Sequence, residues 1–88
     1  MNGSSHRFDR SLDVTGTLCP VPVVEARRAL AEMAAGQVLE VLADDPLAEL
    51  DLKVMCQHTG HALLEGHADP DGRVRALIRC QPSASTRR

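Results

Sequence analysis

Apolar and polar residues follow two different periods along this chain, and each period predicts one kind of element. Short apolar or alternating runs bounded by Gly, Asp or Pro predict four strands, at residues 11–16, 37–43, 61–68 and 73–80. Apolar residues spaced three or four positions apart predict two helices, over residues 20–35 and from Pro46 to about Thr59. The expected order of elements is therefore βαβαββ.

Turn-forming residues separate these segments. Gly16 is expected to stop the first strand, and Gly36 and Gly60 to end the two helices. We interpret Asp44 and Asp45 as helix caps, because they stand directly before a proline that suits the first helical position. The sequence DPDG at 69–72 predicts a tight turn between the last two strands.

The apolar sides of the elements predict how they pack. The residues expected on one side of each element are Val23, Ala26, Leu30 and Met33 in the first helix, Leu47, Leu50, Val54 and His58 in the second, and Val74, Ala76, Ile78 and Cys80 in the last strand. The βαβ step requires a parallel pair with a right-handed crossover, and the final hairpin is antiparallel. We expect an α+β fold, a two-layer α/β sandwich with a mixed four-stranded sheet and two helices on one face.

Length and composition limit the classes of protein to consider. The 88 residues suit one domain, placed at 11–80, with a flexible N-terminal segment at 1–10 and a flexible C-terminal tail at 81–88. A formal net charge of −2 argues against a general nucleic-acid binder. No apolar run is long enough to span a membrane. The three cysteines form no paired framework, so we interpret them as reduced thiols in the cytoplasm.

The segment TGTLCPVPVVEARRAL, residues 15–30, places Cys19 between the first strand and the first helix. The unpaired N–H groups and the dipole at a helix start stabilise a thiolate, so the pKa of Cys19 is expected to fall. Pro20 and Pro22 are tolerated in a first helical turn and stiffen it. The alternative is a half-buried structural cysteine at a proline-rich helix start.

The absence of a second cysteine from this motif changes the expected chemistry. In C-x-x-C redox motifs the neighbouring thiol resolves any mixed disulfide or persulfide on the first cysteine. Here residue 22 is proline, so sulfur on Cys19 has no adjacent thiol to release it. A thiol of this kind suits a carrier better than a disulfide oxidoreductase.

From about Leu12 to Arg79 the chain resembles the TusA-like (SirA-like) sulfur carrier proteins. The resemblance lies in LDVTGTLCPVPVVEARR, GQVLEVLADDP, DLKVMCQHTGHALLE and RVRALIR, and Cys-Pro-x-Pro at the first helix is the family hallmark. It implies that Cys19 carries sulfur as a persulfide, loaded by a cysteine desulfurase or rhodanese type of donor and delivered to an acceptor protein, as in tRNA thiolation or related pathways. The chain departs from the family in having Leu18, where Arg is common, and Met55, where an aromatic residue is common.

Several other residues are candidates for a function. Arg27 matches a basic position of the family pattern, so Arg27 and Arg28 are interpreted as a partner-docking pair, with a solvated helix face as the alternative. The C-x-H-x-x-H sequence of Cys56, His58 and His61 is interpreted as structural, since a helix directs the first two about 200° apart. We therefore expect no metal site, and no cofactor.

The sequence as a whole predicts a monomeric sulfur carrier that needs a protein donor and a protein acceptor to turn over, so whether it counts as an enzyme is left open. We expect it to bind neither nucleic acid in general nor a membrane. Two alternatives remain: a non-catalytic regulatory or interaction module of the same fold, and a monothiol redox sensor. The sequence does not name the pathway.

Overall fold

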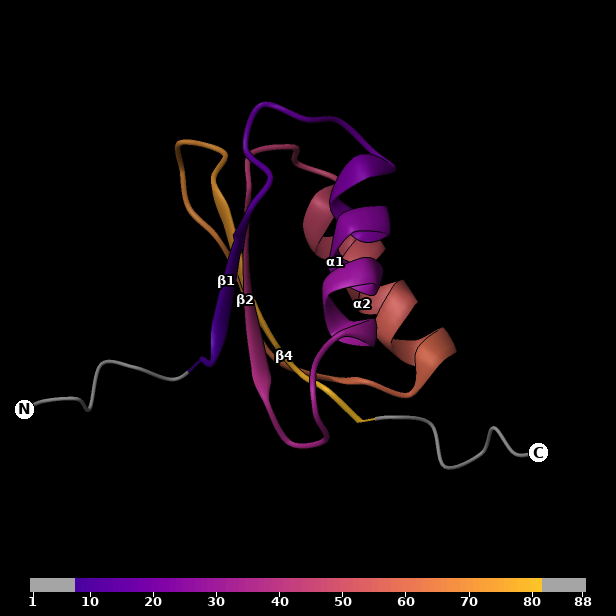
Figure 1. Cartoon of the computed structure of the whole chain (residues 1–88). Coiled ribbons are helices and arrows are strands. Elements are labelled where there is room, and N and C mark those ends of the chain that lie inside the picture. Colours follow the sequence, from indigo (N-terminus) through magenta and orange to yellow (C-terminus); the bar gives the residue numbers. More distant parts are fainter. Residues whose placement is uncertain (1–7, 82–88) are drawn as a thin grey trace, which may run out of the picture.

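The computed structural model describes residues 8–81, and its elements follow the predicted order (Figure 1). They are β1 (Arg10–Asp13), α1 (Val21–Ala31), β2 (Val38–Ala43), α2 (Ala48–Thr59), β3 (Ala62–Ala68) and β4 (Val74–Arg79). The strands form one four-stranded sheet in the order β1-β2-β4-β3. Both helices cover the same face of this sheet (Figure 1). The predicted α+β two-layer sandwich is confirmed.

The sheet is mixed, as the connections require. β1 runs parallel to β2, which is reached through α1, whereas β4 is antiparallel to both β2 and β3. The central pair β2–β4 supplies much of the core, because Leu39 lies opposite Ile78 and both side chains are fully buried beneath the helices. Within residues 8–81, neither helix is long and apolar enough to cross a lipid bilayer.

The strand β3 forms one edge of the sheet and is irregular. Its register against β4 shifts between Leu63 and Glu65, which pair with the consecutive residues Ile78 and Leu77. Such a bulge bends an edge strand and interrupts its hydrogen-bonding pattern. From residue 64 to residue 68 the strand is exposed.

Two element boundaries differ from the sequence-based prediction by three residues or more. The first strand ends at Asp13 rather than Gly16, because the Asp13 carboxylate accepts bonds from the Thr15 N–H (3.0 Å) and hydroxyl (2.7 Å) and so closes a turn. The first helix ends at Ala31 rather than residue 35. There the N–H groups of Glu32 and Met33 bond to carbonyls three residues back, at 3.0 and 3.1 Å, which tightens the last turn.

The predicted buried side of α2 is wrong. Leu47, Leu50 and Val54 are 56%, 59% and 41% exposed. The helix instead packs on the sheet through the small and apolar residues Ala48, Leu52, Met55 and Cys56. This helix has two apolar stripes, and the one that contains Ala48 allows the closer approach to the sheet. The other stripe is left at the surface.

The two chain ends were predicted to be flexible up to residue 10 and from residue 81. Asp9 and Arg10 are instead tied to the domain: the Asp9 N–H donates to the Val38 carbonyl at 2.7 Å, and the Arg10 guanidinium contacts the Glu32 carboxylate at 2.9 Å. Gln81 is likewise tied to the domain, through its N–H bond to the His61 ring, and residues 1–7 and 82–88 lie outside the described residues.

Candidate functional site

The Cys19 thiol lies at the surface, in the turn between β1 and α1. Pro20 is the N-cap of α1, so Cys19 stands immediately before the helix, as predicted. The other two thiols are inaccessible, since Cys56 is 4% exposed and Cys80 is 2% exposed, whereas Cys19 is exposed. Cys19 is therefore the only one of the three that a partner molecule can reach directly.

Two aspartates following β2 hold this turn in place. The buried carboxylate of Asp45 accepts the Cys19 N–H at 2.6 Å and the Leu47 N–H at 2.9 Å. Asp44 accepts the Gly16 N–H at 2.9 Å. Contrary to the prediction, neither aspartate is the N-cap of the second helix, because α2 begins at Ala48 and its N-cap is Leu47. Asp45 does close the turn that leads into α2, through its bond to the Leu47 N–H, and both aspartates also fasten the cysteine turn to the end of β2.

The two prolines of the motif occupy different environments. Pro20 is exposed, and its carbonyl accepts the first helical bond, from the Val24 N–H at 3.0 Å. Pro22 is fully buried in the first turn of α1. The peptide between Cys19 and Pro20 is cis. Pro22 therefore anchors the turn in the core, while Pro20 lies beside the thiol at the surface.

The thiol opens onto a groove of about 380 Å³ between the two helices. The residues that line it are Cys19, Pro20, Val23 and Arg27 on one side and Leu50, Asp51, Val54, Met55, His58 and Thr59 on the other. Leu18, at 73% exposure, stands next to the cysteine in the chain. The surface around the thiol is therefore mostly apolar, with a few charged side chains among the apolar ones.

The predicted fall in the pKa of Cys19 is wrong. Its pKa is raised, chiefly by interaction with the Asp51 side chain, then by desolvation and by the negative charges of Asp51 and Asp45. The helix start offers little to oppose them: Pro20 and Pro22 lack an N–H, and the Val21 N–H already donates to the Leu18 carbonyl at 2.9 Å. The same prolines that identify the motif remove the donors that would stabilise a thiolate.

Arg27 and Arg28, the two candidate docking residues, lie on different parts of the surface. Arg27 lines the groove that holds the thiol. Arg28 lies outside it, where its guanidinium is 3.9 Å from the Glu25 carboxylate one helical turn away. Arg27 thus stands where a partner at Cys19 would meet it, and Arg28 belongs to the neighbouring exposed surface.

The remaining cysteine and histidine candidates lie in three places. Cys56 is buried in the core, and desolvation raises its pKa to about 11. His58 lines the groove, and the His61 Nδ1 accepts the Gln81 N–H at 2.9 Å. Among residues 8–81, no three His, Cys, Asp or Glu side chains lie close enough together to hold a metal ion. The C-x-H-x-x-H sequence therefore does not form a joint site.

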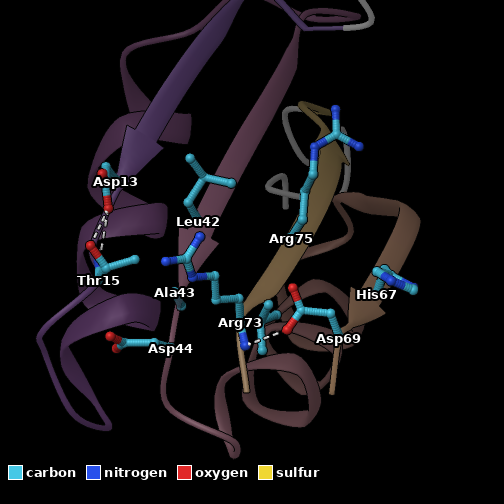
Figure 2. Close-up of a pocket in the computed structure, with 10 residues that line it drawn as sticks. Asp13, Thr15, Leu42, Ala43, Asp44, His67, Asp69, Arg73 and Arg75 are labelled. Atoms are coloured by element: carbon cyan, nitrogen blue, oxygen red, sulfur yellow. Dashed lines mark hydrogen bonds between the residues drawn. The ribbon is translucent and has the colours of Figure 1, made fainter. Parts of the chain in front are cut away.

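A larger hollow, of about 540 Å³, lies on the face of the sheet opposite the helices, near the ends of β1 and β2 (Figure 2). Basic and acidic side chains meet in it, among them Arg73, Arg75, Asp13 and Asp44. Arg75 is already bound, since its Nε donates to the Glu40 carboxylate at 2.6 Å. The hollow contains no cysteine, so the thiol chemistry belongs to the smaller groove.

These positions predict how the three thiols react with iodoacetamide. In the native protein only Cys19 should be alkylated, because the other two are buried. The rate at Cys19 should keep rising with pH past the range of an ordinary cysteine, since its pKa is raised and the thiolate is the reactive form. Peptide mass spectrometry of timed samples over a pH series measures both effects. Faster labelling of Cys56 or Cys80 under native conditions would contradict the assignment.

Comparison with known proteins gives the chain its family. The model of a family described as sulfurtransferase TusA matches residues 10–80. The chain belongs to the TusA family. The match covers β1 through β4, and hence both the cysteine turn and the groove.

Individual relatives agree with this placement in the TusA family. A candidate sulfur carrier protein of Neisseria meningitidis is 48% identical over 62 residues, which are 70% of this chain and 82% of that protein. Sulfur carrier protein TusA of Allochromatium vinosum is 38% identical over 72 residues, covering 82% and 93% of the two chains. The crystal structure of a SirA-like protein from Desulfitobacterium hafniense superposes with a TM-score of 0.73 at 31% identity, over 83% of this chain and 99% of that one.

Sequence reasoning missed the α2 side of the groove that holds Cys19. Asp51 was given no role, and Leu50 and His58 were both placed on the apolar side of the second helix. No local pattern connects them with Cys19, because only the packing of α1 against α2 brings them to the thiol. The sequence feature that could have predicted this side of the groove is the second apolar stripe of α2. A helix that packs only on a sheet needs a single apolar stripe.

Proposed function

We propose that this protein carries sulfane sulfur as a persulfide on Cys19 and relays it from a protein donor to a protein acceptor. The observation that supports this most directly is the exposure of one thiol at the mouth of a groove, while Cys56 and Cys80 are buried. The Cys19 thiolate attacks the outer sulfur of a donor persulfide, R–S–SH. Cys19–S–SH forms and the donor leaves as R–SH, so that neither an oxidant nor a reductant is consumed.

A carrier must also hold its load between partners. A persulfide on Cys19 has no thiol within reach to resolve it, because the other two cysteines lie in the core and residue 22 is proline. The names of the relatives, which describe sulfur carriers, support the same conclusion. The sulfur therefore waits for a thiol that a partner protein supplies.

The surface around Cys19 suits transient contact with such partners. Leu18, Leu47 and Leu50 are all more than half exposed, and Arg27 adds a forked hydrogen-bond donor at the groove. We propose a donor of the cysteine desulfurase or rhodanese type and an acceptor in tRNA thiolation or a related pathway. The protein would work in the cytoplasm as a monomer, with no cofactor of its own.

The test is the mass of the intact protein after incubation with a cysteine desulfurase and cysteine. We expect a gain of about 32 Da, located on Cys19 by peptide mapping and lost on treatment with dithiothreitol. Reversal by dithiothreitol distinguishes a persulfide from a sulfinic acid of nearly the same mass, which thiols do not reduce. An unchanged mass would instead support an interaction module, and a reversible oxidation of Cys19 without added sulfur would support a redox sensor.

A further inference from the structure

Asp51 of α2 lies in the groove with one of its carboxylate oxygens unpaired within the described part of the chain. It lines the same groove as Cys19, and its Oδ2 atom is buried with no hydrogen-bond partner among residues 8–81. Buried carboxylate oxygens are normally paired, so one without a partner calls for an explanation. The explanation we favour is an interaction with the thiol across the groove.

Two carboxylates act on the thiol from different elements. Asp51 interacts with the Cys19 side chain and has the largest influence on its pKa, while Asp45, in the connection before α2, binds the Cys19 N–H at 2.6 Å. The other charged or titratable groups of the groove are Arg27 from α1 and His58 from α2. The pKa of Cys19 is raised, so the two carboxylates and desolvation outweigh the positive charge of Arg27.

We propose that Asp51 restrains Cys19 in both directions, slowing its reaction with stray electrophiles while empty and its loss of sulfur to stray thiols while loaded. This inference rests on the proposed carrier function and assigns Asp51 a role that acts through Cys19. When the protein is empty, the neighbouring negative charge disfavours the thiolate, which is the form that reacts.

The same charge protects the loaded form. A small thiolate R′–S⁻ that attacks the outer sulfur of Cys19–S–SH forms R′–S–SH and expels Cys19–S⁻. A leaving thiolate of higher pKa departs more slowly. Asp51 destabilises this departing thiolate, as it does the free one. Neutralising Asp51 should therefore speed both reactions, whereas damage to the fold would not change their pH dependence in this way.

Replacing the carboxylate with an amide of the same shape tests the proposal. For Asp51→Asn we expect the pH midpoint of Cys19 alkylation to fall, with several-fold faster labelling at neutral pH, because more of the thiol is then ionised. Protein loaded with inorganic polysulfide should also lose its sulfur to glutathione several-fold faster than the unsubstituted protein. Glu49→Gln is the matched control: it removes one charge from the same helix outside the groove and should change neither rate.

Asp51→Glu completes the experiment, because it keeps the charge and should keep both reactions slow. Thermal melts of all variants ensure that folded proteins are compared. An alkylation midpoint that is the same in Asp51→Asn as in the unsubstituted protein would overturn the proposal, and so would an equal shift in Glu49→Gln. These results are independent of the carrier function: if Cys19 accepts no sulfur at all, the proposed function fails, yet the alkylation profiles still decide what Asp51 does.

Discussion

Cys19→Ser should give a folded protein that accepts no sulfur. Serine fits the exposed turn before α1, and the hydrogen bond from the backbone N–H of residue 19 to Asp45 does not depend on the side chain. A hydroxyl cannot hold a sulfane sulfur, so transfer should fall to background rather than merely slow down. A radiolabelled-sulfur transfer assay with a cysteine desulfurase measures this effect, and a thermal melt confirms that the variant is folded.

The two buried cysteines provide matched controls for this loss. Cys80→Ala and Cys56→Ala should both retain sulfur loading, since neither side chain reaches the surface. Cys80→Ala should cost about 1 kcal/mol of stability, because its Sγ packs against the Leu30 and Met33 carbonyls at 3.4 and 3.6 Å. The assignment of Cys19 as the carrier thiol would be refuted if Cys19→Ser still accepted radiolabelled sulfur. It would also be refuted if Cys56→Ala were the only variant that accepted none.

Leu52→Ala should produce the largest loss of stability from a change in α2. Leu52 is 0% exposed and lies in the core beneath the helix, where truncation leaves a cavity that the close-packed surroundings refill only in part. The expected cost is about 3 kcal/mol, a large share of the total stability of a domain of this size. We expect the melting temperature to fall by about 10–20 °C, measured by circular dichroism.

Leu50→Ala is the complementary change two residues away. Leu50 is 59% exposed and lines the groove, so its truncation should alter stability by less than about 0.5 kcal/mol. Its effect should appear instead as slower sulfur uptake from a protein donor, with iodoacetamide labelling of Cys19 unchanged. Equal destabilisation by Leu50→Ala and Leu52→Ala would mean that the two apolar stripes of α2 have been assigned wrongly.

The fold could be predicted from the sequence because each element has a strong local pattern. The stretch VLEVLA in β2 and the alternation through Val74, Ala76 and Ile78 in β4 leave little choice of element, and DPDG joins the last two strands. The βαβ step then determines the parallel pair. The boundaries were less accurate, since the end of α1 depends on how Glu32 and Met33 bond in its last turn.

The site could be predicted only in part, for a physical reason. The position of Cys19 before α1 follows from local sequence, and the structure confirms it. Its electrostatic environment does not, because Asp45 and Asp51 reach the thiol only after β2 and α2 have packed around it. A rule based on helix dipoles alone therefore gave the wrong direction for its pKa.

The bulge in β3 affects how two copies of this protein would behave when they meet. A regular edge strand invites a second molecule to extend the sheet, but here the register breaks between Leu63 and Glu65. Farther along the same edge, His67 adds another exposed polar side chain. Pairing of two copies through β3 is thereby disfavoured, so this edge of the sheet resists the edge-to-edge contact from which aggregates grow.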